Sequence, residues 1–179
     1  MKLLLAVAFV ADTGDPYKRR GLFGKTHISI GEMIRLNDGP WQLLSKDAVG
    51  ELPEHFRRLC CDYEFDDGYE VCPADFQSPA LSFFINHSCD PNVASADNWE
   101  TMIVLRNIEA GEELTCDYGT VNARKEGFTC ACGASNCRKV VTGNDWIRPE
   151  LQERYRGYFQ KNIQEKIDGL NSEQHERSS

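Results

Sequence analysis

A dense group of cysteines in the last third of the chain constrains its fold more than any other feature. Cys130, Cys132 and Cys137 lie within the eight residues CACGASNC, and Gly133 allows the backbone to turn between them. Thiolates at this spacing suit zinc, which takes four ligands in a closed structural site. The segment supplies three, so we expect the fourth from elsewhere. The alternative, a loop of clustered free thiols, would oxidise readily.

A second unusual segment, FINHSCDPN at residues 84–92, offers the missing ligand. Pro91 and its Asn and Asp neighbours indicate a turn. Asn86, His87 and Cys89 adjoin an apolar run, where polar side chains are costly unless they find partners. Cys89 is therefore the natural fourth zinc ligand, and the cluster raises the question of what requires polar groups there.

The other cysteines lack such spacing, and we expect them to be small core or surface residues: Cys60, Cys61, Cys72 and Cys116. Eight cysteines are also compatible with a secreted disulfide protein, and MKLLLAVAFVADTG loosely resembles a signal peptide. That apolar run is short, carries one Lys, and fits a buried first strand better. We therefore expect an intracellular protein with mostly reduced thiols and no transmembrane helix.

The composition excludes some classes of protein. A chain of 179 residues suits one domain with an appendage, and 41% hydrophobic residues are too many for a disordered chain. The net charge of −8 argues against direct nucleic-acid binding and favours a basic partner. The sequence does not indicate an oligomeric state.

The first two-thirds of the chain favours short strands and one helix. Apolar runs separated by Gly, Pro, Asn and Asp predict strands at residues 3–10, 27–36, 80–85, 102–105 and 113–118. A helix is expected at residues 45–60, with Ser45 as its N-cap and a break at Leu52-Pro53. Asp67-Gly68 predicts a hairpin turn.

From Pro149 the pattern changes to that of one amphipathic helix. Apolar side chains recur there at helical spacing: Leu151, Tyr155, Tyr158, Phe159, Ile163 and Ile167. Pro149 suits a first helical turn. We expect this helix to pack on the domain rather than to form a dimer interface, with a solvated tail after it.

Two glycine-containing motifs complete the set. GEELTCDYG at residues 111–119 is a turn followed by a short strand, and Tyr118 taken alone suits a half-buried aromatic residue. RGLFG at residues 20–24 is weak evidence for a phosphate-binding loop. No clear helix follows it, so a dinucleotide-binding fold is not expected.

Together and in this order, the motifs make the chain resemble the SET-domain protein lysine methyltransferases. RGLFGKTHISIGEMI resembles the family's glycine motif, FFINHSCDPNV its asparagine-histidine motif, and GEELTCDYG its tyrosine motif. CACGASNC resembles the cysteine-rich post-SET segment. The resemblance spans roughly residues 18–141. It implies a mainly β SET fold of small sheets with short helices and a pseudoknot, a zinc-stapled post-SET segment and a C-terminal amphipathic helix.

The resemblance also implies domain bounds and site residues. It places a SET domain at residues 1–119, a post-SET zinc segment at 120–142, and a C-terminal helix and tail at 143–179. Tyr118 corresponds to the catalytic tyrosine. The implied contacts to S-adenosylmethionine come from Arg20, Gly21, Leu22, Tyr63, Asn86, His87 and Tyr118. The implied ligands of a structural Zn²⁺ are Cys89, Cys130, Cys132 and Cys137.

The implied activity is S-adenosylmethionine-dependent methyl transfer to a lysine side chain in a protein. Such a transfer needs a neutral amine, and desolvation or a nearby cation lowers the lysine pKa from about 10.4. Alignment can then supply much of the acceleration, and the Tyr118 hydroxyl can orient the amine and the methyl group. No carboxylate is required, so neither Asp117 nor Glu113 is assigned as a general base.

Four positions depart from the family pattern. Arg19 stands where the family has its first glycine, and Lys139 stands where a glycine often follows the cysteines. Phe83 replaces a common arginine, and Asn37 replaces a second channel tyrosine. These departures leave an alternative open, a catalytically weak or inactive SET-fold zinc-containing interaction module.

The expected substrate is a lysine-containing basic protein, a histone among the candidates. An acidic run at residues 62–70 could attract it, and the alternative for this run is a solvated hairpin. Its acidic residues are Asp62, Glu64, Asp66, Asp67 and Glu70.

Overall fold

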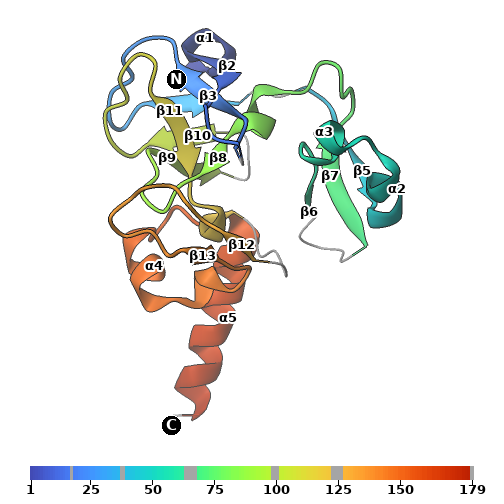
Figure 1. Ribbon diagram of the computed structural model, residues 1–179. Coiled ribbons are helices and arrows are strands. Elements are labelled where there is room, and N and C mark those ends of the chain that lie inside the picture. The colour runs from blue at the N-terminus through green and yellow to red at the C-terminus, as the bar shows by residue number, and fades with distance from the viewer. Residues whose placement is uncertain (17, 37–38, 63–67, 98–100, 122–126, 178–179) are drawn as a thin grey trace.

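The computed structural model describes residues 1–16, 18–36, 39–62, 68–97, 101–121 and 127–177, and its strands form four small sheets. Two sheets build a central body, and a third belongs to an insert (residues 39–79) that stands to one side of the body (Figure 1). The fourth is a two-stranded ribbon beside the C-terminal helices, at the opposite end of the body from the N-terminus (Figure 1).

The first body sheet has the order β1-β4-β10-β9, and the second has the order β2-β3-β11-β8. The first contains β1 (Lys2–Leu3), β4 (Met33–Arg35), β10 (Thr101–Val104) and β9 (Val93–Asp97). The second contains β2 (Ala8–Asp12), β3 (Arg20–Gly24), β11 (Glu113–Cys116) and β8 (Asn86–His87). Their apolar faces enclose the main core, which includes Leu22, Ile34, Val104 and Leu114.

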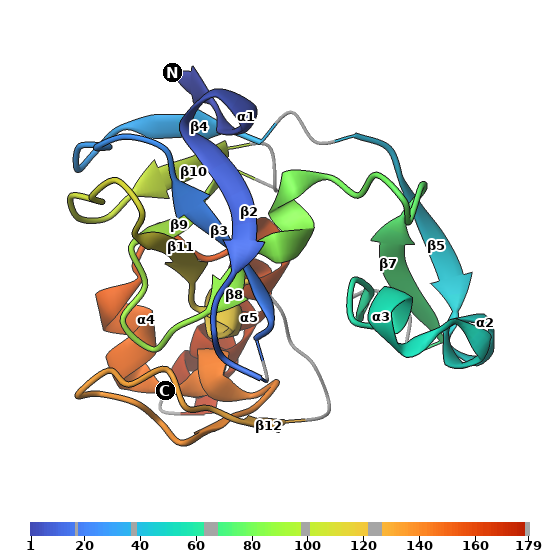
Figure 2. The same ribbon diagram turned by 45° about the horizontal axis from the view of Figure 1, so that its top comes forward.

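The insert has its own sheet and its own small core, and Figure 2 shows it extending away from the body. Its elements are β5 (Trp41–Ser45), α2 (Lys46–Glu51), α3 (Glu54–Arg57), β6 (Cys61–Asp62) and β7 (Tyr69–Pro73). Val49, Cys60 and Cys72 form this core, and the two sulfur atoms lie 2.6 Å apart. A 3-10 helix, η1 (Leu81–Phe84), leads from the insert back to β8.

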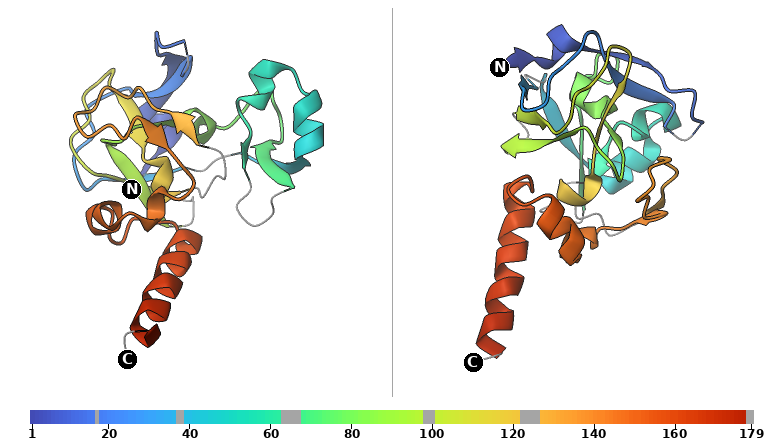
Figure 3. Two further views of the ribbon diagram at one scale, coloured as in Figure 1. Left: turned by 60° about the horizontal axis from the view of Figure 1, so that its bottom comes forward. Right: turned by 90° about the vertical axis from the view of Figure 1, so that its left-hand side faces the viewer.

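The C-terminal third consists of short elements followed by one long helix. They are η2 (Tyr118–Thr120), β12 (Phe128–Thr129), β13 (Val140–Val141), η3 (Asp145–Ile147), α4 (Pro149–Arg154) and α5 (Lys161–Arg177). The far end of α5 projects from the body in both views of Figure 3. Leu151, Tyr155, Ile163 and Ile167 are buried, so the apolar stripe predicted from Pro149 packs on the domain.

The predicted fold class, mainly β with short helices and a C-terminal helix, is confirmed. Ser45 caps α2, since its Oγ accepts a hydrogen bond from the Ala48 N–H across 3.2 Å, and the predicted helix breaks at Leu52-Pro53 as expected. Strands at residues 102–105 and 113–118 are also present, as β10 and β11. The turn predicted at Asp67 lies outside the described residues.

Four predictions of local structure were wrong. Residues 3–10 form β1, a helical turn α1 (Leu4–Val7) and β2, because Leu4 and Val7 point to the core together only in a turn. Residues 80–85 form η1 and not a strand, and residues 27–36 contain only the short strand β4. The single C-terminal helix is two helices, since Gly157 adopts a φ of +83° between them.

Among the described residues, no helix combines the length and the apolar character needed to cross a bilayer.

Candidate functional site

The asparagine-histidine segment and the tyrosine segment, which are distant in sequence, lie side by side. Strand β8 pairs in parallel with β11, with Asn86 opposite Thr115 and His87 opposite Cys116. Asn92, which is fully buried, strengthens this pairing. Its Oδ1 accepts a hydrogen bond from the Thr115 N–H across 2.9 Å, and its Nδ2 donates to the Glu113 carbonyl across 2.8 Å. The chain around β8 is thus tied to β11 by both backbone and side chain.

This pairing places Tyr118 against the residue that precedes the Asn86-His87 pair. The Tyr118 hydroxyl donates a hydrogen bond to the Ile85 carbonyl oxygen across 2.8 Å. The ring lies 5.3 Å from the His87 ring and 6.0 Å from the Phe128 ring, measured between centroids. The hydroxyl therefore has a fixed direction within an aromatic cluster that combines the body with the C-terminal ribbon.

His87 is buried and acts as a structural bridge. Burial lowers its pKa to about 4 even though Asp117 lies nearby, so the ring is neutral at physiological pH. Its Nδ1 lies 3.1 Å from the Tyr118 backbone N–H and accepts that hydrogen bond. The remaining proton must then be on Nε2, which lies 3.3 Å from the Cys89 Sγ and donates to it. His87 thereby connects Tyr118 with the predicted metal ligand.

Asn86 occupies the junction of β8, β3 and β11. Its Nδ2 donates to the Arg20 carbonyl across 2.9 Å and to the Glu113 Oε1 across 2.7 Å. The other oxygen of Glu113 lies 2.9 Å from the Lys18 Nζ. Gly21 is enclosed here, since a Cβ at that position would lie 2.5 Å from the Glu113 Oε1. Only glycine fits between these side chains without displacing one of them.

The two neighbours of Gly21 are placed differently. The Arg20 side chain is exposed, and its guanidinium lies 4.7 Å from the centre of the Phe84 ring. Leu22 is buried in the main core and pairs with both β2 and β11. A cofactor could therefore meet the Leu22 position only through the backbone. Tyr63, the last of the predicted cofactor contacts, lies outside the described residues.

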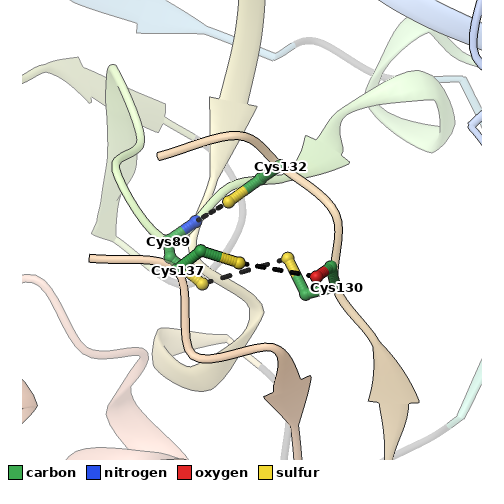
Figure 4. Close-up of side chains that lie close together, drawn as sticks. All are labelled: Cys89, Cys130, Cys132 and Cys137. Carbon is green, nitrogen blue, oxygen red and sulfur yellow. Dashed lines mark hydrogen bonds between the residues drawn. The ribbon is translucent and has the colours of Figure 1, made fainter. Parts of the chain in front are cut away.

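The structure brings the four predicted zinc ligands together, as Figure 4 shows. The Sγ atoms of Cys89, Cys130, Cys132 and Cys137 all lie within 4.8 Å of one another, and those of Cys89 and Cys130 are 3.9 Å apart. A tetrahedral zinc with Zn–S bonds of about 2.3 Å needs sulfurs about 3.8 Å apart. Four thiols from two distant segments fit this ion with only small shifts.

The electrostatics of the cluster also suit a cation. Burial raises the pKa of Cys89 to about 11, and it raises that of Cys130 as well. Burial opposes ionisation of Cys132 too, but hydrogen bonds from the Cys89 and Ala134 N–H groups outweigh it and lower the pKa of that thiol to about 6. A bound divalent metal would compensate the cost of four clustered thiolates, of which those of Cys89 and Cys130 are buried.

Three contacts that the motifs did not reveal hold Cys89 and the cysteine loop in place. The Asn136 Nδ2 and the Arg154 guanidinium both donate to the Cys89 carbonyl, across 2.8 and 3.0 Å. The guanidinium of Arg138 makes a two-pronged ion pair with Asp117, at 2.7 Å for each hydrogen bond. The position of Arg138 directly after Cys137 is the one sequence signal that could have drawn attention to it.

Two of the four departures from the family pattern occur at an unusual backbone conformation. Arg19 has a φ of 56° and Lys139 a φ of 65°, in the left-handed region that favours glycine. Glycine at these positions in the family therefore has a conformational reason, and this chain adopts the same turns with larger residues. Phe83, which stands where the family commonly has an arginine, is half-buried. Asn37 lies outside the described residues, as do Glu64, Asp66 and Asp67 of the acidic run.

A separate hollow of about 350 Å³ lies between β2, β3 and η1. Its lining is mainly apolar, with Arg20 and Lys25 as the charged residues. Asn86, His87 and Tyr118 are not among its lining residues. The hollow therefore adjoins the glycine motif through Arg20 and the FINHSCDPN segment through Phe84, but it does not contain the Asn86, His87 and Tyr118 side chains.

Comparisons with known proteins agree with this arrangement. The family model described as SET domain matches residues 19–119. Human "Histone-lysine N-methyltransferase 2B" is 32% identical over 132 residues, which cover 68% of this chain and 5% of that protein. "Histone-lysine N-methyltransferase Su(var)3-9" of Drosophila melanogaster is 36% identical over 150 residues, covering 68% of this chain and 23% of that protein. The chain thus spans under a quarter of either relative.

Among solved structures, the chain is similar to a humanized mutant of the Chaetomium thermophilum Polycomb Repressive Complex 2 bound to the inhibitor GSK126. The sequence identity is 28% and the TM-score is 0.42, over 63% of this chain and 15% of that one.

Proposed function

The chain belongs to the SET domain family, and from this premise we propose that it transfers a methyl group from S-adenosylmethionine to a lysine side chain of a protein substrate. The observation that carries the proposal is the parallel pairing of β8 with β11, which directs the Tyr118 hydroxyl onto the Ile85 carbonyl. We further propose that residues 1–119 form the SET domain, 120–142 the post-SET zinc segment and 143–179 the C-terminal helix and tail.

The cofactor would be held by the backbone around Arg20 and Gly21 together with the β8 backbone at Asn86 and His87. The side chains support such a role indirectly. Asn86 donates to the Arg20 carbonyl and so fixes β8 against β3, and a Cβ at Gly21 would displace the Glu113 or Asn86 side chain. When bound, S-adenosylmethionine would supply an electrophilic methyl group on its sulfonium.

Tyr118 is the proposed catalytic residue. The oxygen atoms of its hydroxyl and of the Ile85 carbonyl lie next to each other, 2.8 Å apart. Such a pair can accept hydrogen bonds from a lysine amine and weak C–H···O contacts from an activated methyl group. The aromatic rings of Tyr118, His87 and Phe128 cluster beside this point, and an apolar surface of this kind would favour the neutral form of an amine. Positioning, without a general base, would then supply most of the acceleration.

The cysteine cluster would hold a structural zinc ion, with Cys89, Cys130, Cys132 and Cys137 as ligands. All four positions are occupied by protein thiols, so no coordination position remains open for substrate. The metal would fix the segment after the SET domain beside Tyr118, to which Phe128 already packs.

The proposed substrate is a basic protein. The net charge of −8 favours encounter with a Lys- and Arg-rich partner, and the similar proteins are named as histone-lysine N-methyltransferases. A histone is therefore the first substrate to test, and other basic proteins come second. The alternative, a catalytically weak or inactive interaction module, is supported by the departures at Arg19, Phe83 and Asn37.

Cofactor binding to zinc-replete protein tests the proposal. Calorimetry with S-adenosylmethionine and S-adenosylhomocysteine should give clear binding, and Asn86→Ala should abolish it, while Asn107→Ala on the surface should not. Methyl transfer to histones should then be detected by mass spectrometry and be lost in Tyr118→Phe. Binding without transfer to any basic protein would favour the inactive module, and absence of binding by well-folded protein would overturn the proposal.

A further inference from the structure

Arg138 occupies a position that connects the cysteine cluster with the tyrosine segment. It follows Cys137 directly, and its backbone N–H donates to the Cys89 Sγ across 3.4 Å. Its guanidinium points away from the cluster, toward Asp117, which directly precedes Tyr118. One residue therefore contacts a predicted metal ligand with its backbone and the neighbour of the proposed catalytic residue with its side chain.

The clamp between Arg138 and Asp117 is buried and geometrically complete. Nη1 and Nη2 donate to the two carboxylate oxygens of Asp117, each across 2.7 Å, and Nε lies 2.7 Å from the Asp145 Oδ2. The three side chains are exposed by 5% or less. A planar, two-pronged pair of this kind fixes orientation as well as distance, which a lysine ammonium cannot do.

Asp117 in turn fixes the turn that carries Tyr118. Its Oδ1 accepts a hydrogen bond from the Gly119 N–H across 2.9 Å, and its carbonyl accepts one from the Thr120 Oγ1 across 2.8 Å. The same carboxylate thus holds the residue after Tyr118 while Arg138 holds the carboxylate. Any rotation of Asp117 would move the start of η2 and with it the Tyr118 ring.

A second set of contacts, through His87, also links Cys89 to Tyr118. Tyr118 donates its backbone N–H to His87, and His87 contacts the Cys89 Sγ. Cys89 is therefore linked to Tyr118 twice, once through His87 and once through Arg138 and Asp117. The two sets of contacts restrain Tyr118 from both sides, and a shift of the Cys89 sulfur would change both of them.

We propose that Arg138 is a positioning residue that transmits the state of the four-cysteine site to Tyr118, so that the Tyr118 hydroxyl has its working orientation only when the metal is bound. This inference rests on the proposed function for its catalytic meaning, but the coupling itself is a property of the fold. Arg138 does not touch the reacting atoms and acts through Asp117.

Arg154 provides a matched control. Its guanidinium donates to the Cys89 carbonyl, so Arg154, like Arg138, contacts this predicted metal ligand. Arg154 is the last residue of α4, and its other contacts are to Asp90 and the Tyr155 ring, not to Asp117. If support of Cys89 alone mattered, Arg154→Lys and Arg138→Lys would have equal effects.

The test reads Tyr118 directly, by fluorine NMR of protein labelled with fluorotyrosine. The Tyr118 resonance is assigned by its absence in Tyr118→Phe. In the unmutated protein, chelation of zinc should shift this resonance. In zinc-loaded Arg138→Lys the Tyr118 resonance should differ from that of the zinc-loaded unmutated protein. In zinc-loaded Arg154→Lys it should be the same as in the unmutated protein. Turnover of Arg138→Lys should fall about tenfold to a hundredfold, with cofactor affinity within about twofold.

The outcomes separate this inference from the proposed function. An unshifted Tyr118 resonance in zinc-loaded Arg138→Lys, or an equal shift in Arg154→Lys, would overturn the positioning role. If Arg138→Lys failed to fold, Asp117→Asn would address the same clamp from its other side and should shift the same resonance. If no methyl transfer occurred in the unmutated protein, the proposed function would fail, and the NMR comparison would still decide the coupling.

Discussion

The Tyr118 hydroxyl and the Ile85 carbonyl oxygen lie 2.8 Å apart, joined by a hydrogen bond between two segments that the fold threads together. Tyr118→Phe removes this bond and should reduce methyl transfer by about a hundredfold or more. Because the net value of one such bond is about 1 kcal/mol, the variant should fold, and its cofactor affinity should fall by less than about tenfold. Single-turnover kinetics and calorimetry measure the two effects. Tyr158→Phe, between α4 and α5, should change neither.

A side chain at Gly21 should disturb the contacts of Asn86 and Glu113. A Cβ there would lie 2.5 Å from the Glu113 Oε1 and 3.0 Å from the Asn86 Nδ2, so Gly21→Ala must displace the contacts that hold β8 against β3. We expect a loss of about 1–3 kcal/mol of stability and a weaker cofactor affinity. Gly39→Ala is the control, since its Cβ would meet nothing within 4 Å among the described residues. Equal effects of both substitutions on denaturant midpoint and affinity would contradict the packing argument.

Lys139 should be replaceable by glycine with a gain in stability. Its φ of 65° is costly for a residue with a Cβ, while its carbonyl accepts the Cys130 N–H across 2.7 Å and holds the conformation. Lys139→Gly should raise the free energy of unfolding of zinc-replete protein by about 0.5–1 kcal/mol. Lys139→Ala retains the Cβ and should give no such gain. Arg19→Gly, at a φ of 56°, is expected to act in the same direction.

Replacement of the buried Asn92 should strongly lower the stability of the protein. Asn92→Ala would leave the Thr115 N–H and the Glu113 carbonyl without their side-chain partners in a buried place. We expect a loss of about 2–4 kcal/mol, measured by chemical denaturation. Asn107→Ala, which removes one exposed hydrogen bond to Ile30, should cost less than about 1 kcal/mol. A small effect at Asn92 would mean that backbone pairing alone holds β8 to β11.

The cysteine cluster should bind about one zinc ion per chain, and Cys132→Ser should lower the metal content measured by elemental analysis. Cys72→Ser changes a buried cysteine of the insert and should leave the zinc content intact. Chelation should expose the segment around β12 and β13 to proteolysis, because their small hydrophobic cluster is built on Cys89 and Cys130. Full zinc content in Cys132→Ser would refute this ligand set.

The sequence allowed prediction of those parts of the site that depend on residue chemistry and spacing. Four cysteines converge as their pattern indicated, and Ser45 caps its helix as a serine before a helical run should. The role of Arg138 was not predictable, because it depends on three segments meeting at one buried point. No local pattern encodes such a meeting.

The wrong predictions share a physical cause. An apolar run reports that a segment is buried, but it does not report the conformation in which it is buried. Residues 80–85 pack as a 3-10 helix, and Leu4 with Val7 packs as a helical turn, because the core around them accepts those shapes. Likewise, the helical spacing from Leu151 to Ile167 continued across a turn that Gly157 makes possible.

The pairing of β8 with β11 makes the fold depend on contacts that are distant in sequence. The two strands pair in parallel, and the Cys89–Cys130 contact spans 41 residues of chain. Contacts this distant in sequence carry a large loop-closure cost before they return any energy, so folding should be slow compared with a helical domain of equal size. During synthesis, Cys89 emerges long before its partners and must wait as an unligated thiol. Zinc availability in the cell would then limit not only the stability of the finished protein but also the yield of chains that reach it.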